Sequence, residues 1–138
     1  MNRQLLDPAQ RRDWLRLSQT ENVGPATFRQ LIGRYGSAAA ALDVLPELSA
    51  KGGLKRPLRI YSSEAAEADL ERAHELGAAF VAAGEAGYPS LLHHIAGAPP
   101  LLCVMGELAL ADLESVAIVG ARNASAGGRK FARQLAAE

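Results

Sequence analysis

Residues 115–129 read Ser115-Val-Ala-Ile-Val-Gly-Ala-Arg-Asn-Ala-Ser-Ala-Gly-Gly-Arg129. The apolar, β-branched run ends at Gly120, and two further glycines then open a pattern with helical spacing. This order predicts a strand over 115–119, a loop, and a helix that begins near Gly127. Such a loop presents backbone N–H groups and the positive end of a helix dipole to an anion. The stretch therefore predicts a phosphate-binding loop at the start of an α/β domain.

The candidate phosphate ligands all lie in this loop. Arg122 offers a planar fork of N–H donors, and the hydroxyl of Ser125 can hydrogen-bond a phosphate oxygen. The predicted site also includes one more cation, Arg129, and the open backbone of four small residues: Gly120, Ala121, Gly127 and Gly128. The glycine spacing fits neither a dinucleotide fingerprint nor a Walker loop. A strand–helix turn without any ligand remains the alternative.

The composition is that of a globular protein without a global charge. Of 138 residues, 49% are apolar and 22% charged, and 15 cations balance 15 carboxylates. We expect a cytoplasmic protein without a membrane partner, because no leader and no run of about 18 apolar residues occurs. Cys103 is the single cysteine, which excludes an internal disulfide, and its apolar neighbours predict a buried position. We expect no metal and no cofactor, since His93 and His94 lack a second cluster of ligands.

Helix and strand signals divide the chain near Gly77. N-cap residues and prolines predict four helices, beginning at Pro8, at Pro25, after Ser37 and at Ser63, with Pro46 starting a separate short turn. After Gly77 the pattern changes to short apolar runs, which predict strands over 78–83, 101–105 and 115–119. Their unbroken apolarity suits a parallel sheet covered on both faces. We therefore predict a helical domain over 1–77 and the start of a parallel α/β domain over 78–138.

A second motif lies in the helical part, where residues 22–32 read Asn22-Val-Gly-Pro-Ala-Thr-Phe-Arg-Gln-Leu-Ile32. Helix–hairpin–helix modules use a turn of this kind to point N–H groups at a DNA phosphate without reading bases. The candidate DNA contacts of this motif are Val23, Gly24 and Arg29. A plain αα-corner inside a small bundle is the alternative, and Pro25 favours it because proline lacks an amide donor.

Three spaced elements carry a resemblance to a known family. They are Tyr88-Pro-x-Leu-Leu-x-x-Ile95, Pro99-Pro-Leu-Leu-x-x-x-Gly106, and Val116-Ala-Ile-Val-Gly-Ala-Arg122 with Ser125 and Gly128. In this order they resemble the DprA family, also called Smf, the bacterial DNA-processing proteins of natural transformation. The resemblance covers residues 84–138 and extends more loosely over the first 76. It implies an α/β fold in which a small SAM-like or helix–hairpin–helix-like domain precedes a Rossmann-like parallel sheet.

The resemblance implies a non-enzymatic protein that binds and protects single-stranded DNA and loads the recombinase RecA onto it during DNA uptake and recombination. Family members act as homodimers. The family's Gly-Ser-Arg loop reads Gly120-Ala121-Arg122 here, and Gly127 stands where members often have tyrosine. Since the family's domain continues well beyond Glu138, we expect an incomplete Rossmann-like domain that lacks the dimer surface.

Two other classes of function stay open. Rossmann-like nucleotide phosphoribohydrolases share the strand–Gly–x–Arg loop, but they need a catalytic glutamate and arginine that would lie beyond Glu138. A truncated product that folds only its helical domain would act through partner contacts. No Ser/His/Asp arrangement and no carboxylate pair here suggests hydrolysis. We therefore expect a DprA-type DNA-binding module rather than an enzyme.

Overall fold

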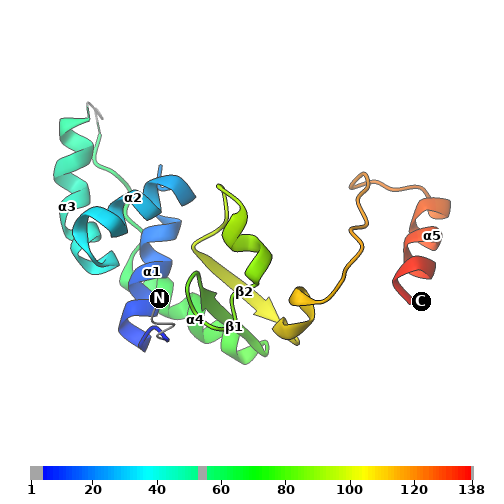
Figure 1. Cartoon of the computed structure of the whole chain (residues 1–138). Coiled ribbons are helices and arrows are strands. Elements are labelled where there is room, and N and C mark those ends of the chain that lie inside the picture. Colours follow the sequence, from blue (N-terminus) through cyan, green and yellow to red (C-terminus); the bar gives the residue numbers. More distant parts are fainter. Residues whose placement is uncertain (1–4, 53–55, 138) are drawn as a thin grey trace.

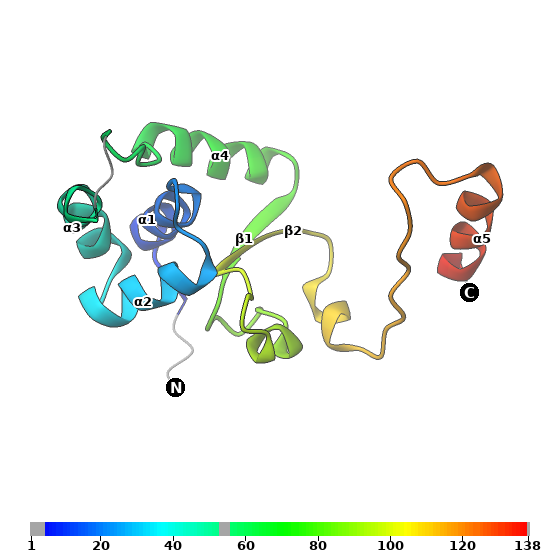
Figure 2. The same ribbon diagram turned by 90° about the horizontal axis from the view of Figure 1, so that it is seen from above.

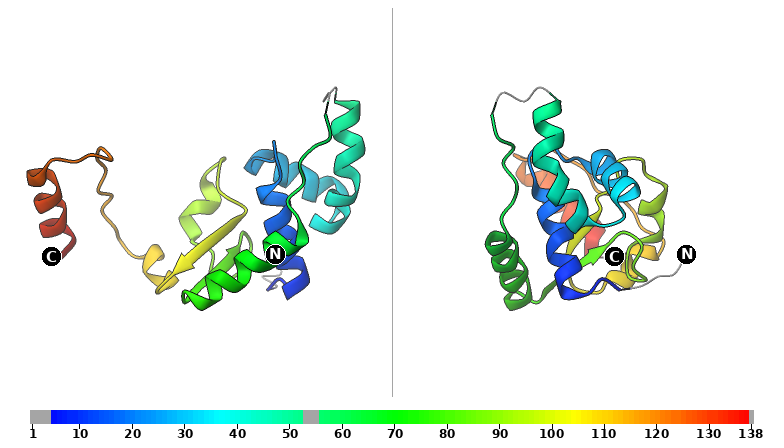
Figure 3. Two further views of the ribbon diagram at one scale, coloured as in Figure 1. Left: turned by 180° about the vertical axis from the view of Figure 1, so that it is seen from behind. Right: turned by 90° about the vertical axis from the view of Figure 1, so that its left-hand side faces the viewer.

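The computed structural model describes residues 5–52 and 56–137. Its helices, strands and short 3-10 helices (η) follow in the order α1 (Pro8–Gln19), α2 (Pro25–Tyr35), α3 (Ala38–Lys51), α4 (Ser63–Glu75), β1 (Ala78–Ala82), η1 (Ser90–His94), β2 (Leu101–Met105), η2 (Leu108–Asp112) and α5 (Ala126–Ala137). Helices α1–α4 lie beside the β1–β2 pair, whereas α5 stands apart at the end of an extended segment (Figure 1). The same separation is visible from behind (Figure 3). A helical part followed by a small sheet confirms the expected mixed α/β class.

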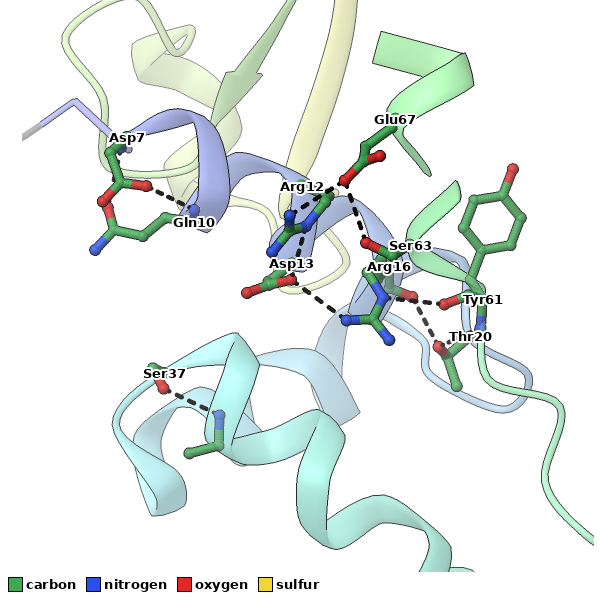
Figure 4. A network of polar contacts seen from close by, with 11 residues as sticks. Asp7, Gln10, Arg12, Asp13, Arg16, Thr20, Ser37, Tyr61, Ser63 and Glu67 are labelled. Atoms are coloured by element: carbon green, nitrogen blue, oxygen red, sulfur yellow. Dashed lines mark hydrogen bonds and ion pairs between the residues drawn. The ribbon is translucent and has the colours of Figure 1, made fainter. Parts of the chain in front are cut away.

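Capping residues begin the helices where the sequence predicts. The Asp7 carboxylate accepts a hydrogen bond from the backbone N–H of Gln10 at 2.8 Å, and the Gln10 side chain accepts one from Asp7 N–H at 3.0 Å. This reciprocal capping box opens α1 (Figure 4). Ser37 caps α3 by accepting from Ala40 N–H at 3.1 Å. Gly36 ends α2 with φ 80°, a left-handed conformation that glycine adopts at little cost.

Helix α3 is longer than predicted. It runs through Pro46 to Lys51 as one helix, although a separate turn was expected there. Proline removes one hydrogen bond from a helix interior. The helix continues because Leu45 is buried in the core and Leu48 packs against it, so tertiary packing offsets the local cost.

The hydrophobic core lies among α1, α2 and α3. These three helices lie next to one another in the view from above (Figure 2). Its buried cluster consists of Leu17, Val23, Phe28, Leu31, Ala38, Ala41, Leu42 and Leu45. The Trp14 ring packs edge-to-face on Phe28 with centroids 5.0 Å apart, which makes it part of the packed interior. The helical part therefore has its own packed interior.

Polar contacts hold α4 and the segment before it against α1 (Figure 4). Arg12 pairs with Glu67 of α4 at 3.2 Å. The Arg16 guanidinium donates to the carbonyl of Tyr61 at 3.2 Å, and Tyr61 N–H donates to the Thr20 hydroxyl at 3.2 Å.

The two strands pair antiparallel, not parallel as expected. Ala78 lies opposite Met105 and Ala82 opposite Leu101. Ala83 N–H donates to the Pro100 carbonyl at 2.8 Å. The connection between β1 and β2 therefore brings the chain back next to β1, as in a hairpin. A parallel pair instead needs a crossover that carries the chain back across a sheet face.

The third predicted strand, over 115–119, is not formed in the described part of the chain. Its backbone has no ladder partner, and Val116 and Val119 are 88% and 91% exposed. Cys103 is also exposed rather than buried. It shares a face of β2 with exposed Met105, because alternate residues of a strand point to the same side, and this face is uncovered.

Two arginines connect α1 and α2 to the region around the sheet. Glu85 is 5% exposed, and its carboxylate accepts hydrogen bonds from Arg11 at 2.7 Å, from Ala82 N–H at 2.8 Å and from Leu6 N–H at 2.9 Å. Burial alone would raise the pKa of Glu85, but these donors outweigh it and the pKa is lowered. Arg29 of α2 donates to the carbonyls of Ala96 and Ala98. The division into domains 1–77 and 78–138 stays a prediction.

None of the helices between residues 5 and 52 or between 56 and 137 combines the length and apolarity needed to cross a bilayer.

Candidate nucleic-acid interface

The predicted phosphate loop lies in an exposed segment between η2 and α5. Residues 114–121 have no regular structure, and Arg122 begins a turn that leads into α5. Gly120, Ala121 and Arg122 are exposed. The segment therefore presents both its backbone and its cation to solvent, as a site for a polyanion requires.

Ser125 has a structural role that the sequence analysis missed. Its hydroxyl oxygen accepts a hydrogen bond from Gly128 N–H at 3.2 Å, and its carbonyl accepts one from Arg129 N–H at 3.0 Å. These bonds cap the first turn of α5, in the manner usual for serine. The signal was a serine directly before a helical pattern. Because a hydroxyl also carries one proton, Ser125 can still donate to an anion while it caps the helix.

The loop glycines are not required by the local backbone. Gly120, Gly127 and Gly128 are absent from the described residues with positive φ. A methyl group built on Gly120 or Gly127 meets nothing within 4 Å, and one on Gly128 meets the Ser125 hydroxyl at an ordinary 3.5 Å. Their effect is to leave the backbone of the loop and of the first turn of α5 uncovered.

Positive charge gathers between residues 115 and 137, ahead of the carboxylate of Glu138. Residues 115–137 contain no aspartate or glutamate, although the whole chain is neutral. The structure places Arg129, Lys130 and Arg133 around one hollow of α5, and Arg122 lies in the turn before this helix. No carboxylate within the described ranges pairs with any of these four cations. The cations are therefore free to meet an external anion.

The second predicted site, at the α1–α2 turn, is partly occupied by contacts within the chain. Asn22 has φ 62° and sets the turn, and Gly24 caps α2 without a side-chain hydrogen bond. The amide of Val23 donates to the Thr20 carbonyl at 3.1 Å, and the Arg29 guanidinium bonds to carbonyls near η1. Gly24 is exposed, and no side chain makes a capping hydrogen bond there. Of the three predicted DNA contacts, it is therefore the one left open to an external anion.

Comparison with protein families assigns both parts of the chain. Residues 8–72 match the DprA-like N-terminal HHH domain, and residues 79–138 match DNA recombination-mediator protein A. A helical HHH domain followed by a recombination-mediator domain defines a protein of DNA recombination and processing. The chain belongs to the DprA family, which confirms the resemblance seen in its sequence. No curated protein matches the chain.

Proposed function

We propose that this chain binds single-stranded DNA through residues 120–129 and the cationic side of α5. In this proposal it acts in the cytoplasm as a binding protein rather than an enzyme, and it protects strands taken up during transformation. RecA as the recipient of those strands, and a homodimeric state, follow from the family resemblance and belong to the same proposal.

One observation carries the proposal. One of four cations lies in the exposed loop and the other three lie along one side of the serine-capped helix α5, and residues 115–137 contain no carboxylate. Release of counterions from phosphates makes such a cluster a strong nucleic-acid ligand, whatever the base sequence. The positive end of the α5 dipole adds to the same field.

Within the proposed site the residues have different tasks. Arg122 can hold a phosphate with two parallel N–H donors. The Ser125 hydroxyl donates its free proton, and the exposed amides next to Gly127 lie at the end of the helix that favours an anion. Arg129, Lys130 and Arg133 supply charge along the strand without base readout.

The test is a titration of the chain against labelled single- and double-stranded oligonucleotides over a range of salt concentrations. We expect preferential single-strand binding that weakens with salt. Arg122→Ala should reduce the slope of log affinity against log salt by about 0.7, the value for one lost contact to a single strand. Arg72→Ala removes an equal charge from an exposed position of α4 and is the matched control. Equal losses in both variants would contradict a site at the loop.

A further inference from the structure

A cleft separates the first two helices from the connection between β1 and β2. Its volume is about 690 Å³, within the range of roughly 300–1,000 Å³ that small-ligand sites occupy. Helices α1 and α2 form one wall, and residues 83–100, which include η1, form the other. This cleft involves none of the residues of the 120–129 site.

Aromatic rings dominate the interior of the cleft. Trp14, Phe28 and Tyr88 line it, with Trp14 half-buried and the other two almost fully buried. The Tyr88 hydroxyl donates to the Pro99 carbonyl at 2.7 Å, which fixes the ring, and the His93 ring lies with its centroid 5.0 Å from that of Tyr88. Because Phe28 and Tyr88 are almost fully buried, the half-buried Trp14 ring and the exposed His93 ring are the aromatic surfaces that a flat ligand group can reach.

The charge at the cleft has one sign. No carboxylate is among the described residues that line it, whereas Arg29, His93 and His94 are all present and exposed. Arg29 uses one N–H on each terminal nitrogen for the carbonyls of Ala98 and Ala96. Because a guanidinium has five N–H donors, others remain for an anion. The ligand that fits combines a planar aromatic group with a negative charge.

We propose that the cleft holds one nucleotide of a bound single strand, with the base against the accessible parts of the Trp14 and His93 rings and the phosphate at Arg29. The inference rests on the proposed single-strand binding and adds to it a second contact point, in the helical half of the molecule. Stacking on aromatic side chains suits a strand of any sequence, because every base has a π-face. Exposed cations at the opening allow the strand to pass outside while one base enters.

Two features of the chain make this testable. Trp14 is the only tryptophan, so its fluorescence reports on the cleft alone. Gly33 lines the cleft, and a Cβ atom built there meets nothing within 4 Å. Gly33→Leu therefore adds apolar bulk at the cleft from a position with room for a Cβ atom, and leucine favours a helix more than glycine does. Gln30→Leu places the same side chain at an exposed position of α2 outside the cleft lining.

The experiment titrates the chain with oligothymidylate, with an abasic oligonucleotide of equal length and with thymidine monophosphate. Trp14 fluorescence and the anisotropy of the labelled oligonucleotides are followed together. We expect oligothymidylate alone to quench Trp14 strongly. Gly33→Leu should weaken oligothymidylate binding by roughly tenfold, the loss typical of one stacked base, and Gln30→Leu should leave it unchanged.

Each other result overturns the inference in a distinguishable way. Oligothymidylate binding without quenching, or equal binding by both leucine variants, removes the cleft but leaves the proposed function standing. Equal quenching by the abasic oligonucleotide would show that the cleft does not bind a base. Equal quenching by thymidine monophosphate would show that the ligand is a free nucleotide and not a strand. If neither oligonucleotide binds, the proposed function fails and the cleft inference fails with it.

Discussion

The helical half and the end of the chain contain similar apolar side chains but bury them to different extents. Every buried hydrophobic residue in the described ranges lies between Leu15 and Tyr88. From Met105 onward the large apolar side chains are exposed apart from the half-buried Leu108, and α5 has no buried residue. Burial therefore depends on a partner surface and not on apolarity alone, because an isolated helix or strand has nothing to pack against. The candidate phosphate loop lies in the unpacked region.

The largest expected effect comes from the same substitution made in each region. Phe28→Ala should lower the free energy of unfolding by about 3–5 kcal/mol, since it leaves a cavity in the core. Phe131→Ala should change it by less than about 0.5 kcal/mol, because the ring is 62% exposed. Urea unfolding followed by circular dichroism measures both. Similar losses would mean that α5 packs on the body in solution.

A smaller effect is expected at the carboxylate that joins α1 to the sheet. Glu85→Gln should cost about 2 kcal/mol at pH 7, because it removes a buried charge-assisted network. The folded state lowers the pKa of Glu85, so the stabilisation is present above the unfolded pKa near 4.5 and is lost as pH falls through the folded value. In thermal unfolding, the midpoint temperatures of the wild type and the variant should converge as the pH is lowered through this range.

The exposed ion pair of Glu67 with Arg12 is the control for that series. Glu67→Gln should cost less than about 1 kcal/mol, because solvent screens a pair whose glutamate side chain is 58% exposed. A loss at Glu67 equal to that at Glu85 would contradict a special role for the buried network.

The last pair of effects concerns two helix caps of the same type. Ser37→Ala should lower global stability by about 1 kcal/mol, because α3 is part of the core. Ser125→Ala should leave global unfolding unchanged and only speed amide exchange in the first turn of α5. A global loss from Ser125→Ala would show that α5 unfolds together with the body.

Local signals were readable from the sequence. Pro8, Pro25 and Ser37 act within a few residues of their own position, and a helix begins at or directly after each of them, as predicted. The direction of strand pairing was not predictable in this way, because it depends on how residues 83–100 return the chain. The exposure of Cys103 is a non-local property for the same reason, since it depends on what covers β2.

The candidate sites show the same difference between local features, which the sequence reveals, and non-local ones, which it does not. The cluster of cations around α5 was visible as sequence, and the structure adds that no carboxylate in the described residues pairs with them. Arg29 was predicted as a DNA contact of the α1–α2 motif, but the structure shows it bridging to Ala96 and Ala98. That bridge spans almost seventy positions, so no local pattern could reveal it.

Hydrogen exchange measured by mass spectrometry, with and without a saturating single-stranded oligonucleotide, compares the two regions in one experiment. Free in solution, residues 115–137 should exchange fast and the amides of α1–α3 slowly, as their packing dictates. Binding at the proposed loop should protect the peptides that contain Arg122 and the first turn of α5. Protection confined to the helical half, with residues 115–137 exchanging as fast as before, would contradict a DNA site at Gly120–Arg129.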